Sequence, residues 1–116
     1  MSTSQNVFRE KRRFLRQLTN TEIAASSKQK INLSALQQEF GLNFNTLSIL
    51  NLDDSNINLE LDGNAVATIQ GSNGSFGFDG RDGLSYNEIT LENLDSGGVV
   101  SSGNVKITVG RTAEES

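Results

Sequence analysis

The stretch Ile57–Ile69, INLELDGNAVATI, indicates the fold class of this chain. Its first five residues alternate between apolar and polar, so Ile57, Leu59 and Leu61 share one face of an extended strand. The Asp-Gly-Asn sequence that follows is typical of a tight hairpin turn, and the remaining residues form the returning strand. The stretch therefore predicts an antiparallel hairpin that buries one face.

The length of the turn decides which side chains of the returning strand are buried. A loop made of all three turn residues would place Ala67 and Ile69 on the face of Leu61. A two-residue turn would place Val66 and Thr68 there instead. The sequence leaves both registers open.

Strand-like segments continue on both sides of this hairpin. They are separated by turns rich in Gly, Asn, Asp and Ser, at a spacing of roughly ten residues. In the last one, NVKITV, apolar and polar residues alternate strictly. The predicted strands besides the hairpin are 47–52, 75–79, 84–94 and 104–109. We expect a mainly β fold, a small antiparallel β-sandwich or jelly-roll-like domain.

The basic stretch near the N-terminus, FREKRRFLRQL, predicts an amphipathic helix. At about 100° per residue, five apolar side chains fall within an arc of roughly 120°, and four arginines fall opposite them. The apolar face is Val7, Phe8, Phe14, Leu15 and Leu18. The basic face is Arg9, Arg12, Arg13 and Arg16.

Two capping patterns predict further helical turns before the sheet begins. Thr19–Glu22 resembles a capping box and would start a short helix through Ile23. Ser34–Gln37 offers a second capping box, and Gly41 a stop, which predicts a helix over residues 34–40. We therefore expect a helical N-terminal arm and linker over residues 1–42, a β-sandwich over 43–111 and an acidic tail over 112–116.

The composition argues against catalysis. The chain has no His and no Cys, so it lacks the commonest general base, the commonest metal ligand and any thiolate. Its aspartates concentrate in turns, where their side chains bond neighbouring amides. We expect a non-enzymatic protein with no cofactor and no metal site.

Two binding alternatives remain open from the residues. Asp79–Gly83 resembles half of a calcium loop, and Asp53, Asp54 and Asn56 form a second set of oxygen donors. A glycan site would need exposed aromatic platforms, for which Tyr86 is the candidate. The Phe residues at 44, 76 and 78 are expected in the core.

Charge is divided sharply along the chain. Residues 1–30 hold seven Lys or Arg against two Glu, a balance of +5, whereas residues 31–116 hold three against twelve, a balance of −9. The predicted basic helix could dock on another subunit, pack on its own sandwich, bind nucleic acid through phosphates or lie on a membrane. Docking is favoured, because the acidic remainder would repel nucleic acid and the apolar face is small for lipid.

Several stretches together resemble the small virion accessory proteins of bacteriophages. They are SILNLDDSNINLELDGNAVATI, GSFGFDG and ITLENLDSGGVVSSGNVKITVGR, and the resemblance covers roughly residues 47–111. The resemblance implies a structural role in capsid decoration, head–tail joining or a spike or fibre base. It implies other particle subunits as partners, and it carries over no catalytic residue.

We therefore expect a structural protein of a multi-subunit particle, a phage virion, that forms homo-oligomers and docks through its N-terminal helix. No run of the chain has the length of apolar residues that a membrane span needs, and the first residues lack the apolar core of a signal peptide. The expected location is the virion, assembled in the host cytoplasm.

Overall fold

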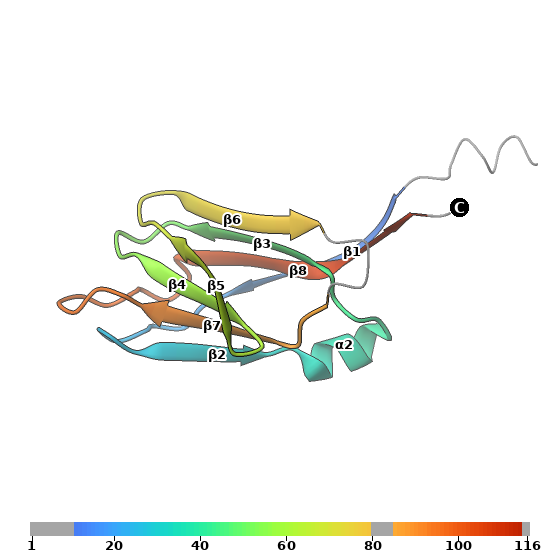
Figure 1. The fold of residues 1–116 in the computed structure, drawn as a ribbon, viewed down its shortest axis with the longest axis horizontal. Coiled ribbons are helices and arrows are strands. Elements are labelled where there is room, and N and C mark those ends of the chain that lie inside the picture. The colour runs from blue at the N-terminus through green and yellow to red at the C-terminus, as the bar shows by residue number, and fades with distance from the viewer. Residues whose placement is uncertain (1–10, 80–84, 115–116) are drawn as a thin grey trace, which may run out of the picture.

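The computed structural model describes residues 11–79 and 85–114, which form two antiparallel four-stranded sheets and one short helix (Figure 1). One sheet has the strand order β1-β8-β3-β6 and the other β2-β7-β4-β5. The elements are β1 Lys11–Thr19, β2 Lys28–Asn32, α2 Ser34–Phe40, β3 Thr46–Asn51, β4 Ile57–Leu61, β5 Asn64–Ile69, β6 Gly74–Asp79, β7 Glu88–Asn93 and β8 Val105–Glu114.

The two sheets face each other across one hydrophobic core, as in a β-sandwich. Strict alternation turns Val105, Ile107 and Val109 of β8 inward, as predicted. The buried core draws apolar residues from both sheets and from the segments between them. The strands predicted at the positions of β3, β4, β6 and β8 are confirmed. In each of them the period-two pattern places apolar residues on the inner face.

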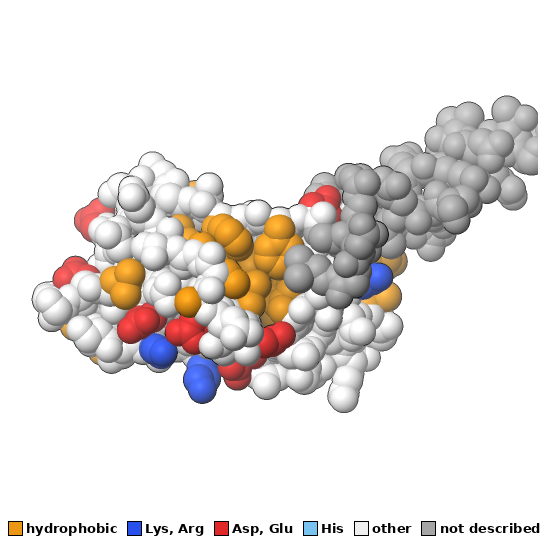
Figure 2. All heavy atoms as spheres, in the orientation of Figure 1, with side chains coloured by type: hydrophobic (Ala, Val, Ile, Leu, Met, Phe, Trp, Pro, Cys, Tyr) orange, Lys and Arg blue, Asp and Glu red, His pale blue; other side chains and the backbone are white. Residues whose placement is uncertain are grey.

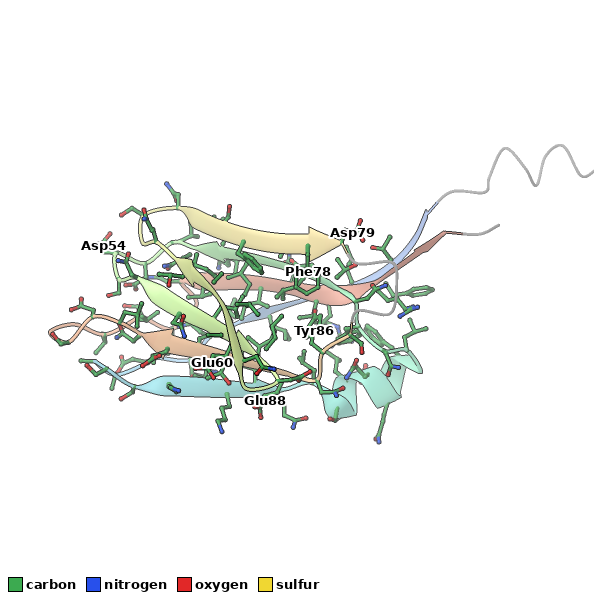
Figure 3. All side chains as sticks on the ribbon, in the orientation of Figure 1. Asp54, Glu60, Phe78, Asp79, Tyr86 and Glu88 are labelled. Carbon is green, nitrogen blue, oxygen red and sulfur yellow. The ribbon has the colours of Figure 1, made fainter. Side chains whose placement is uncertain are left out.

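The core is least covered along the open side between β5 and β6. There Phe76 and Phe78 share the inner face of β6, as predicted, and both are only half-buried. Figure 2 shows hydrophobic side chains in the middle of this face, and Figure 3 places Phe78 close to Tyr86. The rings of Phe78 and Tyr86 lie 5.8 Å apart, edge to face.

The hairpin that indicated the fold uses a two-residue turn. Asp62 and Gly63 both have positive φ, as a tight turn between twisted strands requires. A β-bulge then changes the register, so that Glu60 pairs with Ala65 but Leu59 pairs with Ala67. Val66 is the extra residue of the bulge, which returns Ile69 to the buried face.

Helix α2 forms over the predicted residues and ends at Gly41 with φ 69°. The predicted capping box is wrong: the Ser34 side chain does not cap the helix, and its amide N–H donates to Asn32 Oδ1 over 2.9 Å. Gln37 instead turns into the body. Its Nε2 donates to Asn87 Oδ1, and its Oε1 accepts from the Phe44 amide.

Residues 11–19 form strand β1, so the helix predicted over residues 7–18 is wrong for the part that the structure describes. All nine residues of β1 pair with β8, from Lys11 opposite Glu114 to Thr19 opposite Lys106. An isolated short helix is marginal in water, whereas the ladder satisfies the edge of β8 and packs Leu18 on the core. Residues 7–10 lie outside the described part.

The short helix predicted to start at Thr19–Glu22 is also absent. Ile23 makes an isolated bridge with Val100 and is buried, so the Thr19–Glu22 capping pattern starts no helix. The sheets thus include two strands from the segment 1–42 that the sequence assigned to an arm and linker. Strand β8 likewise extends to Glu114, through residues assigned to the tail.

Among the described residues no helix is long and apolar enough to cross a membrane.

Candidate functional site

The predicted docking residues that the structure describes lie along β1, from Arg12 near the end of β8 to Leu18 opposite Ile107. Val7, Phe8 and Arg9 fall outside the described residues. Arg12 and Arg13 lie in β1 opposite Ala113 and Thr112. In Figure 1 this end of β1 and β8 extends past the neighbouring strands of the sheet.

The strand separates side chains that the helix would have gathered. Arg16 pairs with buried Val109 and Leu18 with buried Ile107, so both lie on the inner face of the sheet, together with Phe14 two residues earlier. Leu15 lies on the outer face, opposite Gly110. The single apolar face predicted for Phe14, Leu15 and Leu18 is therefore wrong, because the side-chain period is two instead of 3.6.

Phe14 and Leu15 remain accessible on their separate faces, at 45% and 43% exposed. Leu18 is half-buried against the core. A methyl group on Gly110 would lie 1.9 Å from the Phe14 carbonyl oxygen, so only glycine lets β1 approach β8 this closely. The role of these residues in docking stays a prediction.

Arg16 is engaged within its own chain. Its Nη2 donates to Glu39 Oε1 over 3.1 Å, and its guanidinium lies over the Phe40 ring, 5.2 Å from the centroid. Both partners belong to helix α2. This arginine therefore fixes α2 against β1, and the pair is exposed enough for its contribution to stability to be small.

A second candidate surface lies at the opposite end, where β3 and β7 each finish in the same tripeptide, Asn-Leu-Asp. We call residues 51–55 the first NLD turn and residues 93–97 the second NLD turn. In the first, Asn51 Oδ1 accepts from the Asp53 amide and Asp53 Oδ1 from the Ser55 amide, at 3.0 and 3.1 Å. Asn51 Nδ2 donates to the carbonyls of Ser55, Ile69 and Gln70.

The second NLD turn repeats this bonding. Asn93 Oδ1 accepts from the Asp95 amide, and Asp95 Oδ1 from the Gly97 amide, both at 2.9 Å. Asn93 Nδ2 donates to three carbonyls, those of Ile23, Ala24 and Gly98. The two turns therefore share one hydrogen-bond pattern, and each lies at the end of a strand, one in each sheet.

Even the loops that brace the two turns match. The Ser72 amide donates to the Asp53 carbonyl, and the Ser26 amide donates to the Asp95 carbonyl. Ser72 and Ser26 both have positive φ, 59° and 56°. Equivalent backbone contacts therefore support the first and the second NLD turn.

The two NLD turns meet and leave their central leucines exposed. Ser55 Oγ donates to Asp95 Oδ2 over 3.2 Å, and the Leu94 amide donates to the Asn56 carbonyl over 3.0 Å. Leu52 and Leu94 are 42% and 45% exposed, and nearby Val99 is 46% exposed. We call these three residues the leucine patch.

The three residues of the leucine patch border two adjoining depressions. Leu52 and Val99 border one of about 360 Å³. Leu94 borders another of about 220 Å³. Asp54, Ser55 and Asp95 line both, so apolar side chains surround a polar, acidic floor.

Asp53 is the buried carboxylate of this end. Burial alone would raise its pKa, but hydrogen bonds from the Ser101 amide, the Asn104 side chain and the Ser55 amide outweigh that effect. The pKa of Asp53 therefore lies below its ordinary value. Both carboxylate oxygens of Asp53 accept hydrogen bonds from the protein, so they are not free to bind a cation.

The geometry tests the glycan alternative and the second oxygen cluster, whereas residues 80–83 of the calcium-loop candidate lie outside the described part. Tyr86 is 2% exposed and its hydroxyl donates to the Thr46 carbonyl, so it offers no glycan platform. Burial raises the pKa of Tyr86. Within the described ranges no three acidic side chains are grouped as a metal site would need. The core position expected for Phe44 is confirmed.

The sequence contains a signal for the NLD turns that pattern reasoning passed over. Residues 45–53, NTLSILNLD, and residues 87–95, NEITLENLD, match at their first residue and at the final Asn-Leu-Asp. A comparison of the two halves of the chain would have found the repeat.

No family model matches the chain. No curated protein and no solved structure is significantly similar to it.

Proposed function

We propose that this protein is a non-enzymatic structural subunit of a multi-subunit particle, a phage virion, and that it docks through its basic N-terminal segment. The observation that carries the proposal is the end of the β1–β8 ladder. Strand β3 pairs with β8 only as far as Gly110, opposite Thr46. The pairing of β1 with β8 continues to Glu114.

The backbone of Thr112 shows where the body of the sheet stops. Its N–H donates to Asn45 Oδ1, and its carbonyl accepts from Asn45 Nδ2, so one amide side chain takes the place of a further β3 residue. Beyond this point residues 113–114 pair, within the described part, with β1 alone. A two-stranded ribbon is marginally stable by itself, which favours a neighbour at this end.

The strand order supports the finer proposal of a jelly-roll topology. Pairing joins β1 to β8, β2 to β7, β3 to β6 and β4 to β5, as in one long hairpin rolled into two sheets. Jelly rolls of eight strands occur in viral capsid proteins. The same architecture also occurs in lectins and cupins, so it supports a particle role without selecting it.

Charge supports docking through the same end. The first 30 residues carry a balance of +5, and the rest of the chain a balance of −9. Acidic side chains gather over β4 and β7 in Figure 2, where Figure 3 labels Glu60 and Glu88. A subunit with one basic segment and an acidic body can attract copies of itself, which supports a homo-oligomer.

Charge reversal tests this function. We expect the full-length protein to assemble at low salt, and the variant Arg9→Glu, Arg12→Glu, Arg13→Glu to remain monomeric in sedimentation velocity. The matched control is Lys30→Glu, Arg81→Glu, Lys106→Glu, which changes net charge equally at other positions and keeps the Lys28–Glu60 ion pair. The control should assemble in the same way as the wild type.

Two results would contradict the proposal. One is equal loss of assembly in the control, which would show that total charge alone matters. The other is unchanged assembly in the arginine variant. Steep, salt-sensitive binding of DNA that the three arginines alone provide would favour a nucleic-acid role instead.

A further inference from the structure

We infer, on the basis of the proposed docking role, that the leucine patch is the acceptor for the N-terminal segment of a second copy of this chain. The contact joins the first ten residues of one copy to Leu52, Leu94 and Val99 of the next. It is a head-to-tail contact, because the two surfaces lie at opposite ends of each copy.

The register places the two surfaces far apart. Lys11 pairs with Glu114, whereas Asn51 pairs with Val105, at the opposite end of β8. Figure 3 shows Asp54 at one end of the molecule and the ribbon of β1 and β8 at the other. Strand β1 spans about 26 Å between its ends at roughly 3.3 Å per residue.

A copy cannot bring its own apolar arm residues to its own patch. Val7 lies four residues before Lys11, a reach of at most about 14 Å from the start of β1. The patch lies beyond the other end of β1, about 26 Å from Lys11 or more. A Val7 or Phe8 side chain on the patch must therefore come from another molecule.

The chemistry of the segment fits the patch. Val7 and Phe8 are adjacent apolar residues, and Arg9 and Lys11 follow them. The patch offers three apolar side chains around depressions that Asp54 and Asp95 line. Apolar contact would hold the segment, and the carboxylates would orient its cations.

The acceptor is held rigidly before any partner arrives. The side chains of Asn51 and Asn93 fix both turns, and Ser55 Oγ joins one turn to the other through Asp95. Little conformational freedom is left to lose at the leucines, which lowers the cost of binding. Because the contact joins two different surfaces, repetition gives a closed ring or a filament.

The first test compares two pairs of exposed apolar residues in the full-length chain. Leu52→Ser with Leu94→Ser should weaken assembly by about tenfold or more in sedimentation velocity, since truncating central apolar anchors is costly. Leu50→Ser with Val66→Ser removes similarly exposed side chains elsewhere and should assemble as the wild type does. Circular dichroism checks that both variants fold.

A mixing experiment tests the head-to-tail direction. Arg9→Asp alters the donor segment, and Asp54→Arg alters the acceptor. We expect each variant alone to lose assembly by about tenfold, and an equimolar mixture to recover it, because each variant supplies what the other lacks. A mixture that stays monomeric overturns the inference.

The outcomes separate this inference from the proposed function. Normal assembly of the Leu52, Leu94 variant, combined with loss in the Arg9, Arg12, Arg13 variant, overturns the acceptor assignment and keeps the docking role. Normal assembly of both variants overturns both. A wild-type chain that stays monomeric at every concentration overturns the contact between copies.

Discussion

Asp53 carries more of the structure than any exposed aspartate beside it. It is 7% exposed, and its two oxygens accept hydrogen bonds from Ser55 in the β3–β4 loop and from Ser101 and Asn104 in the β7–β8 loop. Because these bonds favour the ionised form, folding lowers the pKa of its carboxyl. Stability is thereby linked to pH.

The substitution Asp53→Asn tests this link. We expect a loss of roughly 1–3 kcal/mol at neutral pH, since hydrogen bonds to a charged group are replaced by weaker ones or left unmade. Asp54→Asn is the control, because the carboxylate of Asp54 is exposed and accepts a hydrogen bond from Ser72 Oγ over 3.3 Å. The control should change the unfolding free energy by about 0.5 kcal/mol or less.

The sign of the pH dependence follows from the lowered pKa. The stabilisation is complete above the ordinary pKa of 3.8 and is lost as pH falls through the lower pKa of the folded state. Urea titrations across the acid range should therefore show wild type and Asp53→Asn converging as pH falls. A difference that stays constant through this range would contradict the assignment.

At the scale of the elements, the two NLD turns join the sheets. Asn51 and Asn93 are fully buried, and each places its amide against backbone carbonyls of a different loop. Losing either amide leaves buried donors and acceptors without partners. We expect Asn51→Ala and Asn93→Ala each to cost roughly 2–4 kcal/mol, and the two losses to be similar.

Denaturant unfolding measures these losses, with Asn58→Ala as the control on the outer face of β4. The control should stay within about 0.5 kcal/mol of the wild type. If only one of the two buried asparagines matters, the turns are not equivalent despite their matching bonds.

The elements also show what the sequence could predict. Strands β4 and β8 follow from strict alternation, because that signal is local. The end of α2 follows from Gly41, whereas the capping box that also predicted the helix does not form. Strand β1 could not be predicted in this way. Its residues fit a period of 3.6 on paper, and its partner strand lies more than 85 residues later in the chain.

The candidate site was predicted only in part, for a related reason. Basic composition indicated the N-terminal segment, but the engagement of Arg16 by Glu39 and Phe40 depends on how α2 packs. The exposure of Leu52 and Leu94 is the opposite of what apolar residues beside a strand suggest. It arises because Asn51 and Asn93 turn the chain sharply at each strand end.

At the scale of the whole molecule, stability should differ along β8. Residues 106–110 pair with β1 on one side and β3 on the other, and the inward side chains of Ile107 and Val109 are buried. Residues 113 and 114 pair with β1 past the point where Asn45 ends the sheet. A strand pair without a packed face opens at low cost in free energy, whereas the body opens close to the cost of global unfolding.

Hydrogen exchange measured on the full-length protein tests this gradient and its link to assembly. In dilute monomer we expect amides in 11–13 and 113–114 to exchange much faster than those in 105–110. Under assembling conditions a neighbour that covers the ribbon should slow the exchange of 11–13 and 113–114, and the leucine patch should become protected together with them. Slow exchange of the ribbon already in dilute monomer would mean that the ribbon is stable without a neighbour, and the reason for placing docking at this end would be lost.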